Sequence, residues 1–342
     1  MDKHSHKLSK TSKTVLFSVV GSVFFLLIFC TALMVGRYSI SFTDFFKMLF
    51  SSSGYDMERS IVVNLRLPRT IIAALTGIAL SLSGLLYQET FQNKLVSPDL
   101  LGVSSGAGVG AALAILLGLT SAFISLFAFV FGIVTVLATV FISNVFRNKS
   151  SMILILSGII VGGCMSAILS FIKYLADAET TLAGITYWLM GSFENSLMSD
   201  VWVLLPIVGV CTVITLLLSW RINIVALGRE EAQTRGINYK AYRILIIAIA
   251  TLLTASSVAF AGTISWIGLV VPHIVRLLVG RNTKNSIPLC IVFGANFMVL
   301  TDIISRCFTA AEIPLSAVTG FFGTVIFVVI LFIRRNTVSE RD

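Results

Sequence analysis

Long apolar stretches recur along almost the whole chain, from Val15 to Ile333, and only short polar links separate them. The hydrocarbon core of a bilayer is about 30 Å thick, so a helix needs roughly 20 apolar residues to cross it. Stretches such as Val15–Val35 and Ala122–Val145 meet that length. They lack the period-two alternation of a membrane barrel, and helices then satisfy the backbone inside lipid. The sequence therefore predicts an all-α, polytopic membrane protein.

The composition restricts the function classes. Of the 342 residues 56% are hydrophobic and only 12% are charged, so little of the chain can form a soluble enzyme core. The formal net charge is +9, but the cations fall in the links, and we expect no nucleic-acid partner. The five cysteines form no CxxC pair, and the chain has three histidines, so we expect no metal site and no cofactor.

We expect ten crossings within a single transmembrane domain, residues 1–342. The predicted spans are 14–36, 68–90, 99–118, 122–145, 151–173, 200–219, 243–261, 264–280, 287–305 and 314–333. A further short helix over 178–193 is not expected to cross. Most of the 25 Lys and Arg residues lie on one side in this topology, which orients both termini toward the cytoplasm. Residues 1–13 are then a cytoplasmic tail, and 221–243 is a cytoplasmic segment between the sixth and seventh spans.

One face of the second span carries small and polar residues. Gly77, Ser81, Gly84 and Gln88 follow one another at steps of four, three and four. Small side chains allow helices to approach closely in lipid, so this face is either a tight packing seam or a wall of a translocation path. Both interpretations hold if the helix is central.

Pro272 lies inside the eighth span and is predicted to kink it and to free a backbone carbonyl. His273 follows, and we interpret it either as a hydrogen-bonded packing residue or as part of a gate.

The string LVSPD at 95–99 is weakly similar to LVVPH at 269–273. The topology gives the spans around the two strings opposite orientations, which indicates an inverted internal repeat.

Three arginines are expected at the exterior face. Arg66 and Arg69 flank Pro68 at the start of the second span, and Arg306 ends the ninth. The macrodipole opposes a cation at a helix N-terminus, so another group must favour Arg66 and Arg69 there. The alternatives are contact with lipid phosphate and recognition of an acidic partner. For Arg306, an ion pair with Asp302 one turn earlier is the structural alternative.

The longest polar segment contains LGREEAQTRG at 227–236. Its strong helix formers and closing glycine predict a short amphiphilic helix outside the bilayer that rests on another protein. A solvated loop is the alternative. The chain lacks GxxxxGK[ST], so we do not expect it to bind ATP itself.

These motifs together resemble the iron-siderophore and vitamin B12 permease family, the membrane subunits of type II ABC importers. The segments that carry the resemblance are 65–69, 84–93 with Pro98, 100–107, 227–236, 268–276 and 312–314. Lys94 stands where relatives often carry proline. The resemblance covers residues 37–335. It implies a multi-pass protein of the bacterial inner membrane with ten helices in each permease subunit.

The resemblance also implies partners and residue roles. A second permease subunit, identical or related, would form a central path together with this chain. Two cytoplasmic ATPase subunits and a lipid-anchored or periplasmic substrate-binding protein would complete the importer. Arg66, Arg69 and Arg306 match arginines that meet glutamates of the binding protein. The residues that match the cytoplasmic coupling helix are Leu227, Gly228, Arg229, Glu230, Glu231, Ala232, Arg235 and Gly236. Those expected at the pathway or gate are Gly77, Ser81, Gly84, Gln88, Pro272 and His273.

The expected function is therefore the passage of an iron-siderophore complex, with ATP hydrolysis by separate subunits and no enzymatic activity in this chain. Cobalamin, haem or another metal chelate are alternative cargoes. An ion-coupled secondary transporter is the rival class, and Asp302 is its best intramembrane carboxylate. A membrane receptor or signalling scaffold is disfavoured, because the sequence offers no cytoplasmic domain to report a signal.

Overall fold

The computed structural model describes residues 10–50, 54–146, 151–309 and 311–339, and the regular secondary structure in these ranges is entirely helical. The all-α prediction is confirmed. Seven helical stretches are long and apolar enough to cross a membrane. They correspond to α1 (Lys10–Met34), α4 (Leu67–Thr90), α6 (Ser121–Val145), α7 (Ser151–Leu175), α9 (Met198–Leu217), α12 (Tyr239–Ala261) and α14 (Thr283–Cys307).

The three remaining predicted spans correspond to α5 (Val103–Leu116), α13 (Ile267–Val279) and α15 (Leu315–Ser339). The first two are shorter than predicted because left-handed residues interrupt the backbone beside them. Gly102 (φ 80°) and Gly118 (φ 66°) flank α5, and Trp266 (φ 73°) precedes α13. The number of crossings stays a prediction. Of the predicted tail, residues 1–9 lie outside the described part, and the rest begins α1.

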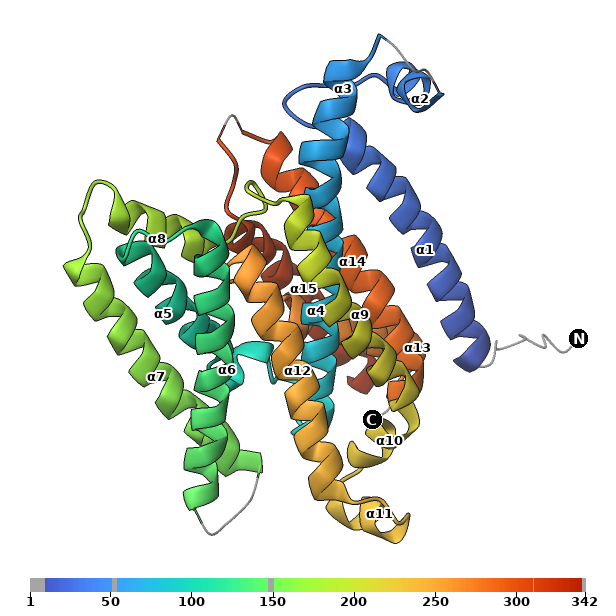
Figure 1. The fold of residues 1–342 in the computed structure, drawn as a ribbon. Coiled ribbons are helices and arrows are strands. Elements are labelled where there is room, and N and C mark those ends of the chain that lie inside the picture. The colour runs from blue at the N-terminus through green and yellow to red at the C-terminus, as the bar shows by residue number, and fades with distance from the viewer. Residues whose placement is uncertain (1–9, 51–53, 147–150, 310, 340–342) are drawn as a thin grey trace, which may run out of the picture.

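Short helices mark the two ends of the bundle. At one end lie α2 (Phe42–Phe50), α3 (Asp56–Ser60) and α8 (Thr181–Met190), and at the other lie α10 (Ser219–Val225) and α11 (Arg229–Thr234) (Figure 1). The predicted short helix over 178–193 is α8. A π-helical turn, η1 (Ile61–Arg66), joins α3 to α4, and a 3-10 turn, η2 (Pro98–Leu101), precedes α5.

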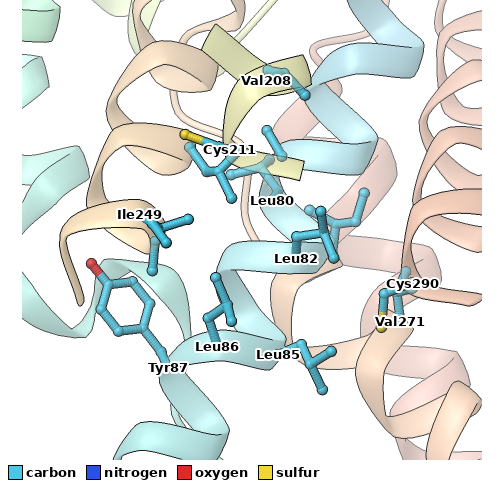
Figure 2. Packing of buried hydrophobic residues seen from close by; sticks show 14 of the residues in the cluster. Leu80, Leu82, Leu85, Leu86, Tyr87, Val208, Cys211, Ile249, Val271 and Cys290 are labelled. Atoms are coloured by element: carbon cyan, nitrogen blue, oxygen red, sulfur yellow. The ribbon is translucent and has the colours of Figure 1, made fainter. Parts of the chain in front are cut away.

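Helix α4 lies at the centre of the bundle and is buried along nearly its whole length (Figure 1). Its polar side chains are buried together with its apolar ones, which is the pattern of a helix enclosed by other helices. Figure 2 shows Leu80, Leu82 and Leu86 of α4 among Ile249 of α12 and Val271 of α13. This helix therefore connects the two ends of the molecule through the core.

The small-residue face of α4 packs against the backbones of α13 and α14. A Cβ atom added to Gly77 would lie 2.1 Å from the carbonyl oxygen of Gly294, and one added to Gly84 would lie 1.9 Å from that of Gly268. Neither position has room for a side chain. The packing-seam interpretation is confirmed, because glycine is what allows these backbones to touch.

We predict that Gly84→Ala destabilises the protein by about 1–3 kcal/mol, because its methyl group would overlap the backbone of α13. The matched control is Gly163→Ala on α7, where an added Cβ meets nothing within 4 Å. Thermal unfolding in detergent micelles measures both. Equal melting temperatures for the two variants would contradict the close contact.

Candidate functional site

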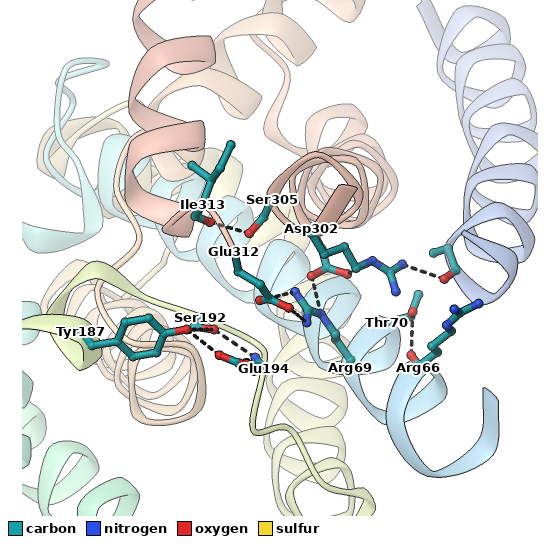
Figure 3. A network of polar contacts seen from close by, with 12 residues as sticks. Arg66, Arg69, Thr70, Tyr187, Ser192, Glu194, Asp302, Ser305, Glu312 and Ile313 are labelled. Atoms are coloured by element: carbon teal, nitrogen blue, oxygen red, sulfur yellow. Dashed lines mark hydrogen bonds and ion pairs between the residues drawn. The ribbon is translucent and has the colours of Figure 1, made fainter. Parts of the chain in front are cut away.

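Five charged side chains gather where α4 begins and α14 ends, and we call them the arginine cluster. They are Arg66, Arg69, Asp302, Arg306 and Glu312. Figure 3 shows Arg69 between the two carboxylates. Its Nε lies 2.7 Å from Oδ1 of Asp302, while Nη1 and Nη2 donate to the two oxygens of Glu312 at 2.6 and 2.9 Å. Such bidentate pairing fixes both the position and the orientation of the guanidinium group.

The other two arginines bind the end of α1. Arg66 Nη1 donates to the carbonyl oxygens of Leu33 and Met34 at 2.9 and 2.7 Å, and Arg306 Nη2 donates to that of Ala32 at 2.6 Å. Carbonyls at a helix C-terminus have no intrahelical donor and carry the negative end of the macrodipole. The C-terminus of α1 is thus the group that favours these cations.

Asp302 also pairs with Arg306, whose Nε lies 3.4 Å from Oδ2, so the predicted ion pair one helical turn apart is confirmed. Arg66, Arg69 and Arg306 are 5, 8 and 6% exposed. Because they are buried and their guanidinium groups bind carboxylates or backbone carbonyls of this chain, contact with lipid phosphate does not explain them in this structure. With three cations and two carboxylates, the arginine cluster retains one net positive charge.

Glu312 was not predicted as a site residue. It lies in the link between α14 and α15, and hydrogen bonds of the residues that follow it hold that link in place. Ser305 and Ile313 exchange two hydrogen bonds, one of them between backbone atoms at 3.0 Å, and Leu315 N donates to Gly191 O at 3.1 Å. Its position two residues before Pro314, which precedes α15, was the available signal. The arginine cluster therefore joins α1, α4, α14 and the start of α15.

A second polar group lies near the other end of α4, and we call it the glutamine cluster. Pro272 has no N–H, so the Gly268 carbonyl one turn earlier lacks its helical donor. Gln88 Nε2 supplies that donor at 3.1 Å and also donates to Val96 O at 3.2 Å. Arg276 donates to Gln88 Oε1 and, at 3.3 Å, to Glu89. The freed carbonyl that the sequence predicted is thus bound by a predicted site residue.

His273 is 3% exposed, and its Nδ1 lies 3.0 Å from the carbonyl oxygen of Leu269. Phe327 of α15 meets the imidazole edge-on, with ring centroids 5.4 Å apart. These contacts support the packing interpretation of His273. A gating role stays a prediction.

The predicted pathway residues of α4 are enclosed within this chain. Gly77 and Ser81 face α14, where Ser81 Oγ donates to Cys290 O at 2.7 Å, and Gly84 and Gln88 face α13. All four are buried, so the face does not border open space in this subunit.

The polar segment between α9 and α12 forms two short helices, α10 and α11. Ile222, Ile224 and Ala232 are buried in the main apolar core. Gly236 (φ 71°) ends α11, as the closing glycine predicted. The exposed residues of the segment include Leu227, Arg229, Glu230 and Arg235. The segment is therefore a pair of short helices that pack on the core by their apolar residues, and it is not a solvated loop.

A family model and several known proteins match the chain. The model of the FecCD transport family matches residues 24–333. The molybdate import system permease protein of Haemophilus influenzae is 34% identical over 90% of this chain and 93% of its own length. The Fe(3+) dicitrate transport system permease protein of Escherichia coli is 34% identical over 90% and 92%. A solved ABC transporter assigned to the metal-chelate type, in an inward-facing conformation, matches with a TM-score of 0.84 and 34% identity over 92% of this chain and 98% of that chain.

We predict that Arg69→Leu destabilises the protein by about 3–5 kcal/mol, because it leaves two buried carboxylates without their main partner. Arg235→Leu is the control, since its ion pair with Glu231 joins side chains that are 49 and 44% exposed, and we expect a loss below about 1 kcal/mol. Thermal unfolding in detergent compares them. Similar small losses would show that the arginine cluster does not support the fold.

Proposed function

The chain belongs to the FecCD transport family and is a multi-pass permease of a type II ABC importer in the inner membrane, and we propose that its cargo is an iron-siderophore complex. The observation that carries the importer assignment is the match to this family over residues 24–333. Permease subunits of ABC importers are not enzymes, and separate subunits hydrolyse ATP.

The cargo rests on the relatives. One bears the name of a ferric dicitrate permease, and the solved neighbour is assigned to the metal-chelate type. A ferric complex is therefore the first candidate, and cobalamin, haem or another metal chelate are alternatives. An equally similar relative is named for molybdate, so this oxyanion belongs among the cargoes to be tested.

The proposed assembly contains a second permease subunit, identical or related, and two cytoplasmic ATPase subunits. Because Gly77, Ser81, Gly84 and Gln88 are enclosed by α13 and α14, we place the cargo path between the two permeases. In this arrangement α4 stiffens the wall of the path. The exposed side chains of residues 227–236 are the proposed contact with the ATPase.

At the other end, the arginine cluster is the proposed contact with an extracellular substrate-binding protein. Its net positive charge attracts acidic groups. However, Arg69 already holds Asp302 and Glu312. Docking on Arg69 therefore requires exchange, in which a carboxylate of the binding protein replaces Glu312.

An ion-coupled transporter is the less favoured class. It needs a carboxylate that binds and releases the coupling ion. Asp302 is 0% exposed and lies between Arg69 and Arg306. Two fixed cations beside it oppose the binding of a proton or Na⁺.

We predict that proteoliposomes containing this chain and its cognate ATPase, with the binding protein on the opposite side of the membrane, transport ferric siderophores. Transport requires ATP on the side of the membrane where the ATPase lies. Uptake of radiolabelled ferric siderophore, ferric citrate, cobalamin, haem and molybdate in parallel identifies the cargo. Omission of the ATPase is the control. Accumulation driven by a proton or sodium gradient alone would refute the importer, and preference for another cargo would refute only the siderophore.

We predict that Glu312→Gln strengthens binding of the cognate substrate-binding protein by about threefold to tenfold, because it weakens the internal competitor for Arg69 and removes one negative charge. Glu179→Gln, in the exposed link between α7 and α8 at the same end, makes the same charge change away from the arginine cluster. Surface plasmon resonance on the nanodisc-embedded protein measures both. Unchanged or weaker binding by the Glu312 variant would contradict the exchange.

A further inference from the structure

The C-terminus of α4 ends in an unusual cap. Asn93 N donates to Gln88 O at 3.2 Å, and Gln92 N donates to Glu89 O at 3.3 Å, which together form a Schellman motif. Such a motif needs a left-handed residue at the position that Gln92 occupies, and glycine is favoured there. Gln92 has φ 53°, and it and Trp266 are the non-glycine residues with positive φ in the described part of the chain.

The Gln92 side chain makes a contact that glycine could not make. Its Nε2 donates to the carbonyl oxygen of Ala226 at 3.2 Å. Ala226 is the C-cap of α10, and carbonyls at such a position lack an intrahelical donor. The contact joins the end of α4 to the link between α10 and α11.

The absence of a side chain at Gly228 leaves room for the Gln92 amide that makes this contact. A Cβ atom at Gly228 would lie 2.9 Å from Gln92 Nε2, and its φ of 110° is one that other residues rarely adopt. Gln92 thus keeps a backbone conformation that residues with a side chain rarely adopt, and its amide lies against Gly228, which has no Cβ to obstruct it. Strained positions of this kind are retained where the surrounding structure uses them.

From these observations we infer that Gln92 is a positioning residue that transmits displacement of the α10–α11 segment to α4. The inference rests on the proposed function, in which this segment contacts the ATPase. Helix α4 is 24 residues long, about 36 Å, and Arg69 lies near its other end. Gln88, one turn before Gln92, ties the same helix end to α13. Movement of α11 then shifts α4 and α13 together.

The test measures cargo moved per ATP hydrolysed in liposomes that contain the complete importer. Gln92→Glu has nearly the same shape but cannot donate to Ala226 O, and Gln92→Gly removes the amide and relieves the backbone. We expect both to lower the ratio by about threefold or more, the scale of a coupling contact. Asn93→Asp makes the same amide-to-carboxylate change one residue away and keeps its acceptor for Leu95 N, so its ratio stays at the wild-type value.

Gln92→Gly separates positioning from stability. We expect it to unfold at the same or a higher temperature than the wild type while its transport ratio falls, which a merely structural residue would not show. Gln92→Arg keeps a side-chain donor for the Ala226 carbonyl, so we expect it to retain the wild-type ratio of cargo moved to ATP hydrolysed. A wild-type ratio in both Gln92→Glu and Gln92→Gly would overturn the inference. Absence of ATP-driven uptake by the wild type would instead refute the proposed function.

Discussion

The contact of α4 with the backbones of α13 and α14 is the constraint on which the rest of the structure depends. Lipid supplies no hydrophobic force between helices, so close packing and hydrogen bonds must hold them together. Gly77 and Gly84 bring the helix axes near enough for both. At that distance Ser81 and Gln88 reach backbone carbonyls of the neighbouring helices. The small-residue face is therefore a joint with both packing and polar contacts.

The arginine cluster shows how ionic groups persist in such a bundle. Each guanidinium group meets a carboxylate or the carbonyls that end α1, and none of the three arginine residues is more than 8% exposed. Buried ion pairs contribute little net stability, but loss of one partner is costly. Such a cluster favours one arrangement of α1, α4 and α14 over others. It also leaves a positive charge at the end where a binding protein is proposed to dock.

The sequence was a good guide to the helices and a poor one to their partners. Apolar length predicted each long helix, and Arg69 and Arg306 were recognisable because most Lys and Arg residues lie on the other side of the predicted topology. Glu312 was missed, since its pairing with Arg69 joins residues 243 positions apart and depends on the packed arrangement. The left-handed Gln92 was also unpredictable, because glycine is the residue that normally signals such a cap. Local patterns specify elements, whereas contacts between elements appear only in three dimensions.

The carbonyl that Pro272 leaves without a helical donor links two distant positions. Gln88 donates to this Gly268 carbonyl, so a residue with a backbone N–H at position 272 would compete with Gln88 for the same acceptor. Conversely, replacement of Gln88 would leave the acceptor buried and unsatisfied. Substitutions at the two sites are therefore expected to be epistatic, because the cost of losing Gln88 depends on whether the residue at 272 can donate to the same carbonyl.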